Sequence, residues 1–145
     1  MDYLKIRLLG TDNKEHALED YKGTKVLLYF YPKDDTPGCT TEAKDFSSLK
    51  EKYKDKGYQI IGVSRDSHLS HKRFCQKHGI DLLLLSDTEG LLANAFTVIK
   101  EKSLYGKKYL GIERSTFILD ENGKIIKEHR AVNPTNHAIT ILESI

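Results

Sequence analysis

Residues 25–40 read KVLLYFYPKDDTPGCT. The part from Lys25 to Tyr31 is short and almost wholly apolar, which is typical of a strand buried on both faces of a parallel sheet. Pro32 ends that run. Thr36 and Pro37 then have the pattern of a helix N-cap followed by proline at the first helical position. The stretch therefore predicts a buried strand, a short loop and a helix.

The rest of the chain continues this alternation. Apolar residues at spacings of three and four predict that the helix after Pro37 continues until Gly57 stops it. Turn residues and apolar runs predict the remaining elements: strands at Tyr58 to Val63 and Asp81 to Leu85, helices at Ser67 to His78, Glu89 to Phe96 and Pro134 to Ile145, and a hairpin of Ser115 to Leu119 with Lys124 to Arg130. The polar, lysine-rich segment from Thr97 to Gly111 indicates a surface excursion, and the residues up to Gly23 are compatible with one more hairpin.

This order of elements predicts an α/β protein. Strands joined through a helix lie parallel, whereas a hairpin adds antiparallel neighbours. The result is a mixed β-sheet with helices on both faces, and the succession resembles the thioredoxin fold. The chain has 145 residues, with no internal repeat and no obvious linker. We therefore expect one domain that spans residues 1–145.

Composition limits the classes of partner. Lys and Arg number 23 and Asp and Glu number 21, which gives a formal net charge of +2. Nucleic acids and anionic membrane surfaces usually demand a clustered basic excess, so neither is expected as a partner. The apolar runs are too short to span a bilayer, and the N-terminus lacks the pattern of a signal peptide. We expect a cytoplasmic protein.

The chain has two cysteines, Cys39 and Cys75, which are too few for a disulfide scaffold or a zinc ribbon. Cys39 falls in the first turn of the predicted helix, where backbone N–H groups are unpaired and the helix dipole is positive. Both features favour a thiolate, which is the reactive form of cysteine. Gly38 is expected to let a small substrate approach the backbone. The plainer interpretation of Cys39 is a small packed residue.

Two acidic residues complicate this site. Asp34 and Asp35 oppose the formation of a thiolate at Cys39, so the site needs a nearby cation. Lys33 is one candidate, but we expect it to be solvated. The sequence therefore predicts that the fold brings a better cation to Cys39.

The spacing of Pro32, Thr36 and Cys39 matches the P-x-x-x-T-x-x-C signature of peroxiredoxins. The longer stretch from Phe30 to Ala43 resembles the Q-type group, also called bacterioferritin comigratory proteins. Further matches occur at Ser86-Asp87, at residues 114–120 and at Gly123-Lys124, so the resemblance covers nearly the whole chain from about Leu4. It implies a monomeric thiol peroxidase that reduces hydrogen peroxide and alkyl hydroperoxides and needs neither a metal nor an organic cofactor.

The resemblance also implies a role for each matching residue. Cys39 corresponds to the peroxidatic cysteine, which becomes a sulfenic acid. Thr36 corresponds to the threonine whose hydroxyl bonds the thiolate and the peroxide, and Pro32 to the proline that walls the pocket. Arg114 corresponds to the arginine that stabilises the thiolate and orients the peroxide. The plainer interpretations are a helix N-cap for Thr36 and a surface salt bridge for Arg114.

The sulfenic acid must then be resolved. Many Q-type members carry a second cysteine five residues after the first, but here that position is Lys44. Other members place it where Cys75 lies, so the resemblance implies a Cys39–Cys75 disulfide that thioredoxin or a similar dithiol reduces. A disulfide needs Cα atoms within about 7 Å, so we expect oxidation to unwind the helix around Cys39 or the helix around Cys75. The alternative is a one-cysteine enzyme that an external thiol resolves.

The helix predicted around Cys75 carries several histidines. His68, His71, Cys75 and His78 share one face, which we expect to be solvated. A zinc site is the weaker interpretation, because one helix rarely supplies a full ligand set. A further hypothesis is that protonated His71 or His78 eases thiolate formation at Cys75.

Two other classes of protein compete with the peroxidase. A thioredoxin-type disulfide oxidoreductase requires a C-x-x-C motif, which the sequence lacks, and a proline before the hairpin strand, where the chain has Glu113 to Thr116. A non-catalytic thioredoxin-like binding module would leave the combination of Thr36, Cys39 and Arg114 unexplained.

Overall fold

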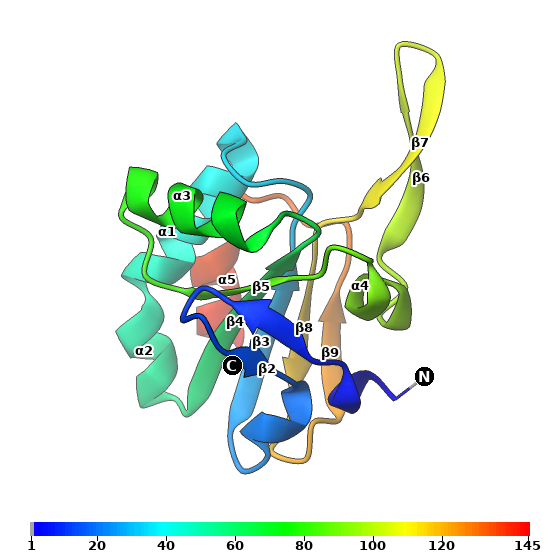
Figure 1. The fold of residues 1–145 in the computed structure, drawn as a ribbon. Helices are drawn as coiled ribbons and strands as arrows, with labels where there is room; N and C mark the ends of the chain where they lie inside the picture. The colour runs from blue at the N-terminus through cyan, green and yellow to red at the C-terminus, as the bar shows by residue number, and fades with distance from the viewer. Residues whose placement is uncertain (1) are drawn as a thin grey trace.

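The computed structural model describes residues 2–145, and its centre is a seven-stranded sheet (Figure 1). The strand order is β2–β1–β5–β4–β3–β8–β9. The strands of this sheet are β1 (Leu8–Gly10), β2 (Glu15–His16), β3 (Lys25–Phe30), β4 (Tyr58–Ser64), β5 (Leu83–Ser86), β8 (Ser115–Leu119) and β9 (Ile125–His129). β3, β4 and β5 are parallel, whereas β8, β9, β1 and β2 add antiparallel pairs. The predicted mixed sheet is confirmed.

β3 is the buried strand that the sequence predicts. Its side chains alternate between the two faces of the sheet. Leu27 and Tyr29 belong to a hydrophobic cluster on one face, and Val26, Leu28 and Phe30 belong to a cluster on the other. All five are buried, because the sheet is covered on both faces.

Four helices cover the first face: α1 (Pro37–Ser48), α2 (Lys50–Asp55), α3 (His68–His78) and α5 (His137–Ser144). The other face packs against α4 (Leu91–Ala95) and the short 3-10 helices η1 (Tyr3–Lys5) and η2 (Leu18–Tyr21). Figure 1 shows α1, α2 and α3 together on one side of the sheet and α4 on the other. Cys39 belongs to the first cluster and Cys75 packs against it, so both cysteines lie on the same face.

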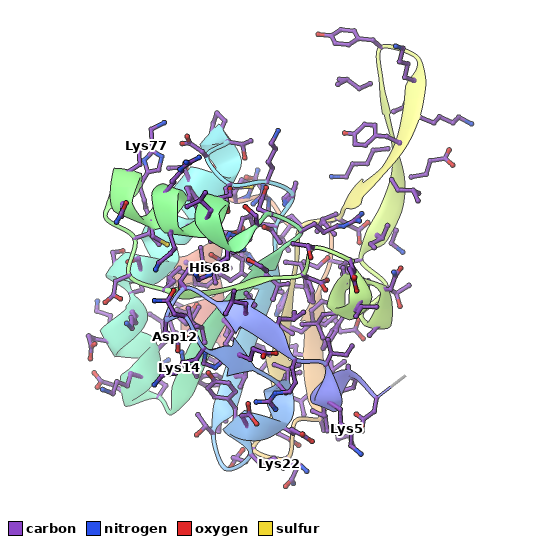
Figure 2. All side chains as sticks on the ribbon, viewed as in Figure 1. Lys5, Asp12, Lys14, Lys22, His68 and Lys77 are labelled. Carbon is purple, nitrogen blue, oxygen red and sulfur yellow. The ribbon has the colours of Figure 1, made fainter. Side chains whose placement is uncertain are left out.

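One local prediction needs correction, and another is confirmed with added detail. The helix expected to run unbroken from Pro37 to Gly57 is divided at Leu49 into α1 and α2, and Leu49 has a ψ of 2°, outside the helical range. The lysine-rich excursion is a regular hairpin of β6 (Ile99–Leu104) and β7 (Lys107–Ile112). Within residues 2–145 these two strands pair only with each other, and the hairpin projects from the molecule with its side chains spread into solvent (Figures 1 and 2).

Among residues 2–145, none of the helices combines the length and the apolar character that crossing a bilayer requires.

Candidate active site

Cys39 lies in the first turn of α1, as the sequence predicts. Thr36 occupies the N-cap position and Pro37 the first helical position, so Cys39 is the third residue of the helix. The backbone N–H groups of Gly38 and Cys39 therefore have no partner inside the helix, and the positive end of the helix dipole lies at this turn. The Cys39 side chain is 1% exposed. The plainer interpretation, a packed residue, thus describes its burial but not its polar surroundings.

Sheet register brings Arg114 to Cys39. β8 runs antiparallel to β3, with Ser115 opposite Phe30. The residue before β8 therefore lies beside the residues that follow β3, which lead into α1. Arg114 Nη2 donates a hydrogen bond to Cys39 Sγ at 3.4 Å. The fold thus supplies the cation that the sequence requires near Cys39, and the Arg114 side chain is largely buried, with 14% of it exposed.

The same guanidinium also binds a buried carboxylate. Arg114 Nη1 donates to Glu42 Oε1 at 2.7 Å, and the Glu42 side chain is fully buried. Burial raises the pKa of Glu42 to about 7, although Arg114 opposes this shift. Burial would lower the pKa of Arg114, but Glu42 and Cys39 outweigh it, and that pKa is raised. One cation therefore serves both Cys39 and Glu42.

Sequence reasoning missed Glu42. Its position three residues after Cys39 places both side chains on one face of α1, and this spacing was the available signal. Glu42 Oε2 has no hydrogen-bond partner among residues 2–145. The carboxyl group is therefore poised between its charged and neutral forms near neutral pH.

We expect the variant Glu42→Gln to change how stability depends on pH. A carboxyl group with a raised pKa in the folded state contributes stability that is fully present below its unfolded pKa, about 4.5, and is lost as the pH rises through about 7. Glutamine cannot titrate but keeps an oxygen that accepts from Arg114. The difference in unfolding free energy between the variant and the wild-type protein should shift in favour of the variant by on the order of 2 kcal/mol as the pH rises from 5 to 8. Urea unfolding at both pH values measures this difference. Glu51→Gln, at an exposed position of α2, is the control. A difference that is equal at both pH values would refute the raised pKa.

Thr36 and Gly38 make contacts of their own next to Cys39. The Thr36 hydroxyl does not cap α1, because it donates to the Lys33 carbonyl oxygen at 2.8 Å. Its oxygen remains available to accept a hydrogen bond. A Cβ atom on Gly38 would lie 3.2 Å from Arg114 Nη2 and from Pro134 Cγ, so the missing side chain makes room for protein atoms. Thr36 and Pro32 are both partly exposed.

The two aspartates are paired with α3. Asp34 accepts hydrogen bonds from Tyr31, Ser70 and His71 at 2.6–2.7 Å. Asp35 accepts from Lys77 Nζ at 2.7 Å and from His78 Nε2 at 2.6 Å. Their negative charges are therefore largely balanced by α3, and Lys33 is exposed as expected.

These contacts overturn the prediction that the histidine face of α3 is solvated. His71 is fully buried, with Nδ1 against Asp34 Oδ2 and Nε2 donating to the Leu85 carbonyl oxygen. The sequence shows the shared face but not its partner. Asp34, Asp66 and His71 place three ligand-type atoms within 4.8 Å of one another, but these atoms already bond protein groups.

Cys75 lies in the last turn of α3, which ends at His78 and has Gly79 as its C-cap. Both cysteines are free thiols in the structure. Burial, followed by the charges of Asp34 and Asp81, raises the pKa of Cys75 to about 11. The hypothesis that a neighbouring histidine eases thiolate formation at Cys75 is therefore not supported. Cys75 also borders a cavity of about 580 Å³ that Lys72 and Gln76 help to line.

Comparison with known proteins agrees with this architecture. The model of the AhpC/TSA family matches residues 3–128. Peroxiredoxin Bcp of Bacillus subtilis (strain 168) is 48% identical over 140 residues, covering 97% of this chain and 89% of the relative. A solved structure of the bacterioferritin comigratory protein of Xanthomonas campestris, from work on its alkyl peroxide reduction activity, has a TM-score of 0.93 and 42% identity, covering 98% of this chain and 90% of that chain.

The thioredoxin-like fold and these matches define the class of protein, a peroxiredoxin, which is a peroxidase. The chain belongs to the AhpC/TSA family, and its similarity to Bcp and Q-type proteins assigns it to that branch. The predicted fold and family are confirmed.

Proposed function

We propose that this peroxiredoxin reduces hydrogen peroxide and alkyl hydroperoxides with Cys39 as the attacking thiolate. The observation that carries the proposal is the 3.4 Å hydrogen bond from Arg114 Nη2 to Cys39 Sγ at the start of α1. A guanidinium stays charged at any physiological pH and presents several donors at once. One donor stabilises the sulfur anion and another binds Glu42, and a donor that remains is available to bond the peroxide. This favours an enzyme over a binding module.

In the first step the Cys39 thiolate attacks one oxygen of the peroxide. An S–O bond forms as the O–O bond breaks, and the departing oxygen takes a proton and leaves as water or an alcohol. The sulfur loses two electrons and becomes a sulfenic acid, while the peroxide gains them. Thr36 accepts a hydrogen bond from the peroxide O–H, because its own proton is given to Lys33. Pro32 limits the entry of water at the mouth of the site.

Cys75 is the resolving residue of this proposal. Its thiol attacks the sulfenic sulfur, forms the Cys39–Cys75 disulfide and releases water. Two observations support the pairing: both cysteines lie on the same face of the sheet, and Lys44 occupies the other usual position. In addition, two variants of peroxiredoxin Q from Xanthomonas campestris replace cysteines that are as far apart in sequence as Cys39 and Cys75. Thioredoxin or a similar dithiol then reduces the disulfide by thiol exchange.

Mass spectrometry tests the resolving step. Protein treated with one equivalent of peroxide and analysed without reductant should contain a peptide pair linked through Cys39 and Cys75. The Cys75→Ser variant should reduce one equivalent of peroxide and then stall with thioredoxin as the reductant. If this variant turns over normally with thioredoxin, the protein is a one-cysteine peroxidase that an external thiol resolves.

A further inference from the structure

The loop before Cys39 and the helix that carries Cys75 are joined at the exposed end of α3. Asp35, in that loop, accepts hydrogen bonds from Lys77 and His78, two and three residues after Cys75. Lys77 is labelled at this end of the molecule in Figure 2. Both partners lie in the last turn of α3, the same turn as Cys75. Asp35 therefore links the loop before one cysteine to the helical turn of the other.

The last turn of a helix is its weakest part, because its carbonyl groups lack helical partners and it frays first. Here Gly79 and Ile80 both donate their N–H groups to the Cys75 carbonyl oxygen, which ends the helix. Opening the whole last turn, with these two bonds, would release Cys75 without unfolding the first half of α3. That half is held separately, since Ser70 and His71 bond Asp34, and His68 and Lys72 bond Asn13.

Close packing does not hold Asp35 against the last turn of α3. A cavity of about 240 Å³ lies along it, lined by Asp34, Asp35, Ser70, Phe74 and Lys77 among others. The Asp35 side chain is 43% exposed and Lys77 62% exposed. Polar contacts that water and salt can reach therefore connect Asp35 to the last turn of α3.

The backbone conformation at Asp35 helps to direct its side chain toward α3. Its φ is 61°, in the left-handed region that aspartate and asparagine tolerate better than most residues. The bend at Asp35 lets Asp34 and Asp35 both reach α3 from adjacent positions. Lys77 and His78 lower the pKa of Asp35, so its carboxylate stays charged at neutral pH.

We propose that Asp35 is a positioning residue for the resolving step: its pairs with Lys77 and His78 hold the last turn of α3 closed and set how fast Cys75 reaches the sulfenic acid of Cys39. This inference rests on the proposed Cys39–Cys75 disulfide. With the turn closed the two cysteines are unlinked, and a slow opening gives the sulfenic acid time to react with a second peroxide and become a sulfinic acid. Asp35 thus sets the balance between resolution and overoxidation.

The test compares Asp35→Asn with Asp55→Asn. Asparagine tolerates the left-handed backbone and removes the charge and one of the two acceptor oxygens. Asp55 is an exposed aspartate of α2 that forms no ion pair within residues 2–145. After mixing with peroxide, samples are quenched with acid and their disulfide and sulfinic acid contents are measured. Asp35→Asn should form the disulfide about threefold to fivefold faster and accumulate less sulfinic acid. The rate of the first peroxide reaction is measured separately, so that a change at Cys39 is not counted as faster resolution.

The salt dependence of disulfide formation distinguishes an electrostatic role of Asp35 from a purely structural one. Near 1 M salt the screening length is about 3 Å, so added salt should accelerate disulfide formation in the unvaried protein and in Asp55→Asn but not in Asp35→Asn. Amide hydrogen exchange at residues 75–80 of the reduced protein should also be faster in Asp35→Asn. If the unvaried protein forms no Cys39–Cys75 disulfide, the resolving role fails and the inference fails with it. If the disulfide forms at the same rate in both variants, the positioning role of Asp35 is refuted, while the resolving role of Cys75 stands.

Discussion

Replacing Cys39 with serine is expected to abolish peroxide reduction. A serine hydroxyl is not ionised near neutral pH and cannot take up an oxygen atom and release it to a thiol, so neither half of the cycle remains. Peroxide consumption with dithiothreitol or thioredoxin should fall to the level without protein. The substitution is nearly isosteric and leaves Glu42 to hold Arg114, so the fold should persist.

Assays of Cys39→Ser and Cys75→Ser with dithiothreitol, run side by side, distinguish the attacking cysteine from the resolving one. Dithiothreitol is a small thiol that can reduce a sulfenic acid directly, so Cys75→Ser should remain active with it. Residual turnover above about a tenth of normal in Cys39→Ser would mean that another group attacks the peroxide. The choice of Cys39 would then be wrong, even though the protein is a peroxiredoxin.

Replacing Arg114 with methionine is expected to give the second largest effect. The variant loses the charged donor to Cys39 Sγ, and removal of one such electrostatic donor typically lowers a rate by about 10²-fold to 10³-fold. The quantity to measure is the second-order rate of peroxide consumption at limiting peroxide. Arg114→Lys should lose less activity, because it keeps a charge without the planar, multiple donors.

Stability must be separated from reactivity in this variant. Arg114→Met leaves the buried Glu42 carboxylate without its partner, which is destabilising in its own right. The double variant Glu42→Gln, Arg114→Met removes that unpaired charge. It should recover stability to urea without recovering the rate. A folded double variant that reacts within threefold of the normal rate would refute the role of Arg114.

Much of the fold can be predicted from short-range patterns. The apolar run of β3, the proline after it and the Thr36-Pro37 helix start together predict that Cys39 lies at the beginning of α1, where it is found. The break of the first helix at Leu49 cannot be predicted in this way, because the apolar spacing continues across it. The β6–β7 hairpin also escapes prediction, because its strands are largely exposed on both faces and lack a regular apolar alternation.

The residues of the site can be predicted only where they belong to a recognisable sequence motif. Arg114 is assigned from the resemblance, and its position follows from a strand register that the sequence alone does not give. The pairing of Asp34 and Asp35 with α3 could not be predicted, since it joins residues about 40 positions apart through tertiary contact. For that reason the sequence predicts that Asp34 and Asp35 oppose thiolate formation at Cys39. In the structure both carboxylates instead pair with side chains of α3.

The projecting β6–β7 hairpin has a practical consequence. Tyr105 and Gly106 form its tip, and Tyr105 is almost fully exposed. The chain contains no tryptophan. A single tryptophan or dye placed at this tip would lie outside the core of the molecule (Figure 1). The hairpin is therefore a natural attachment point for a fluorescent probe or a surface linker.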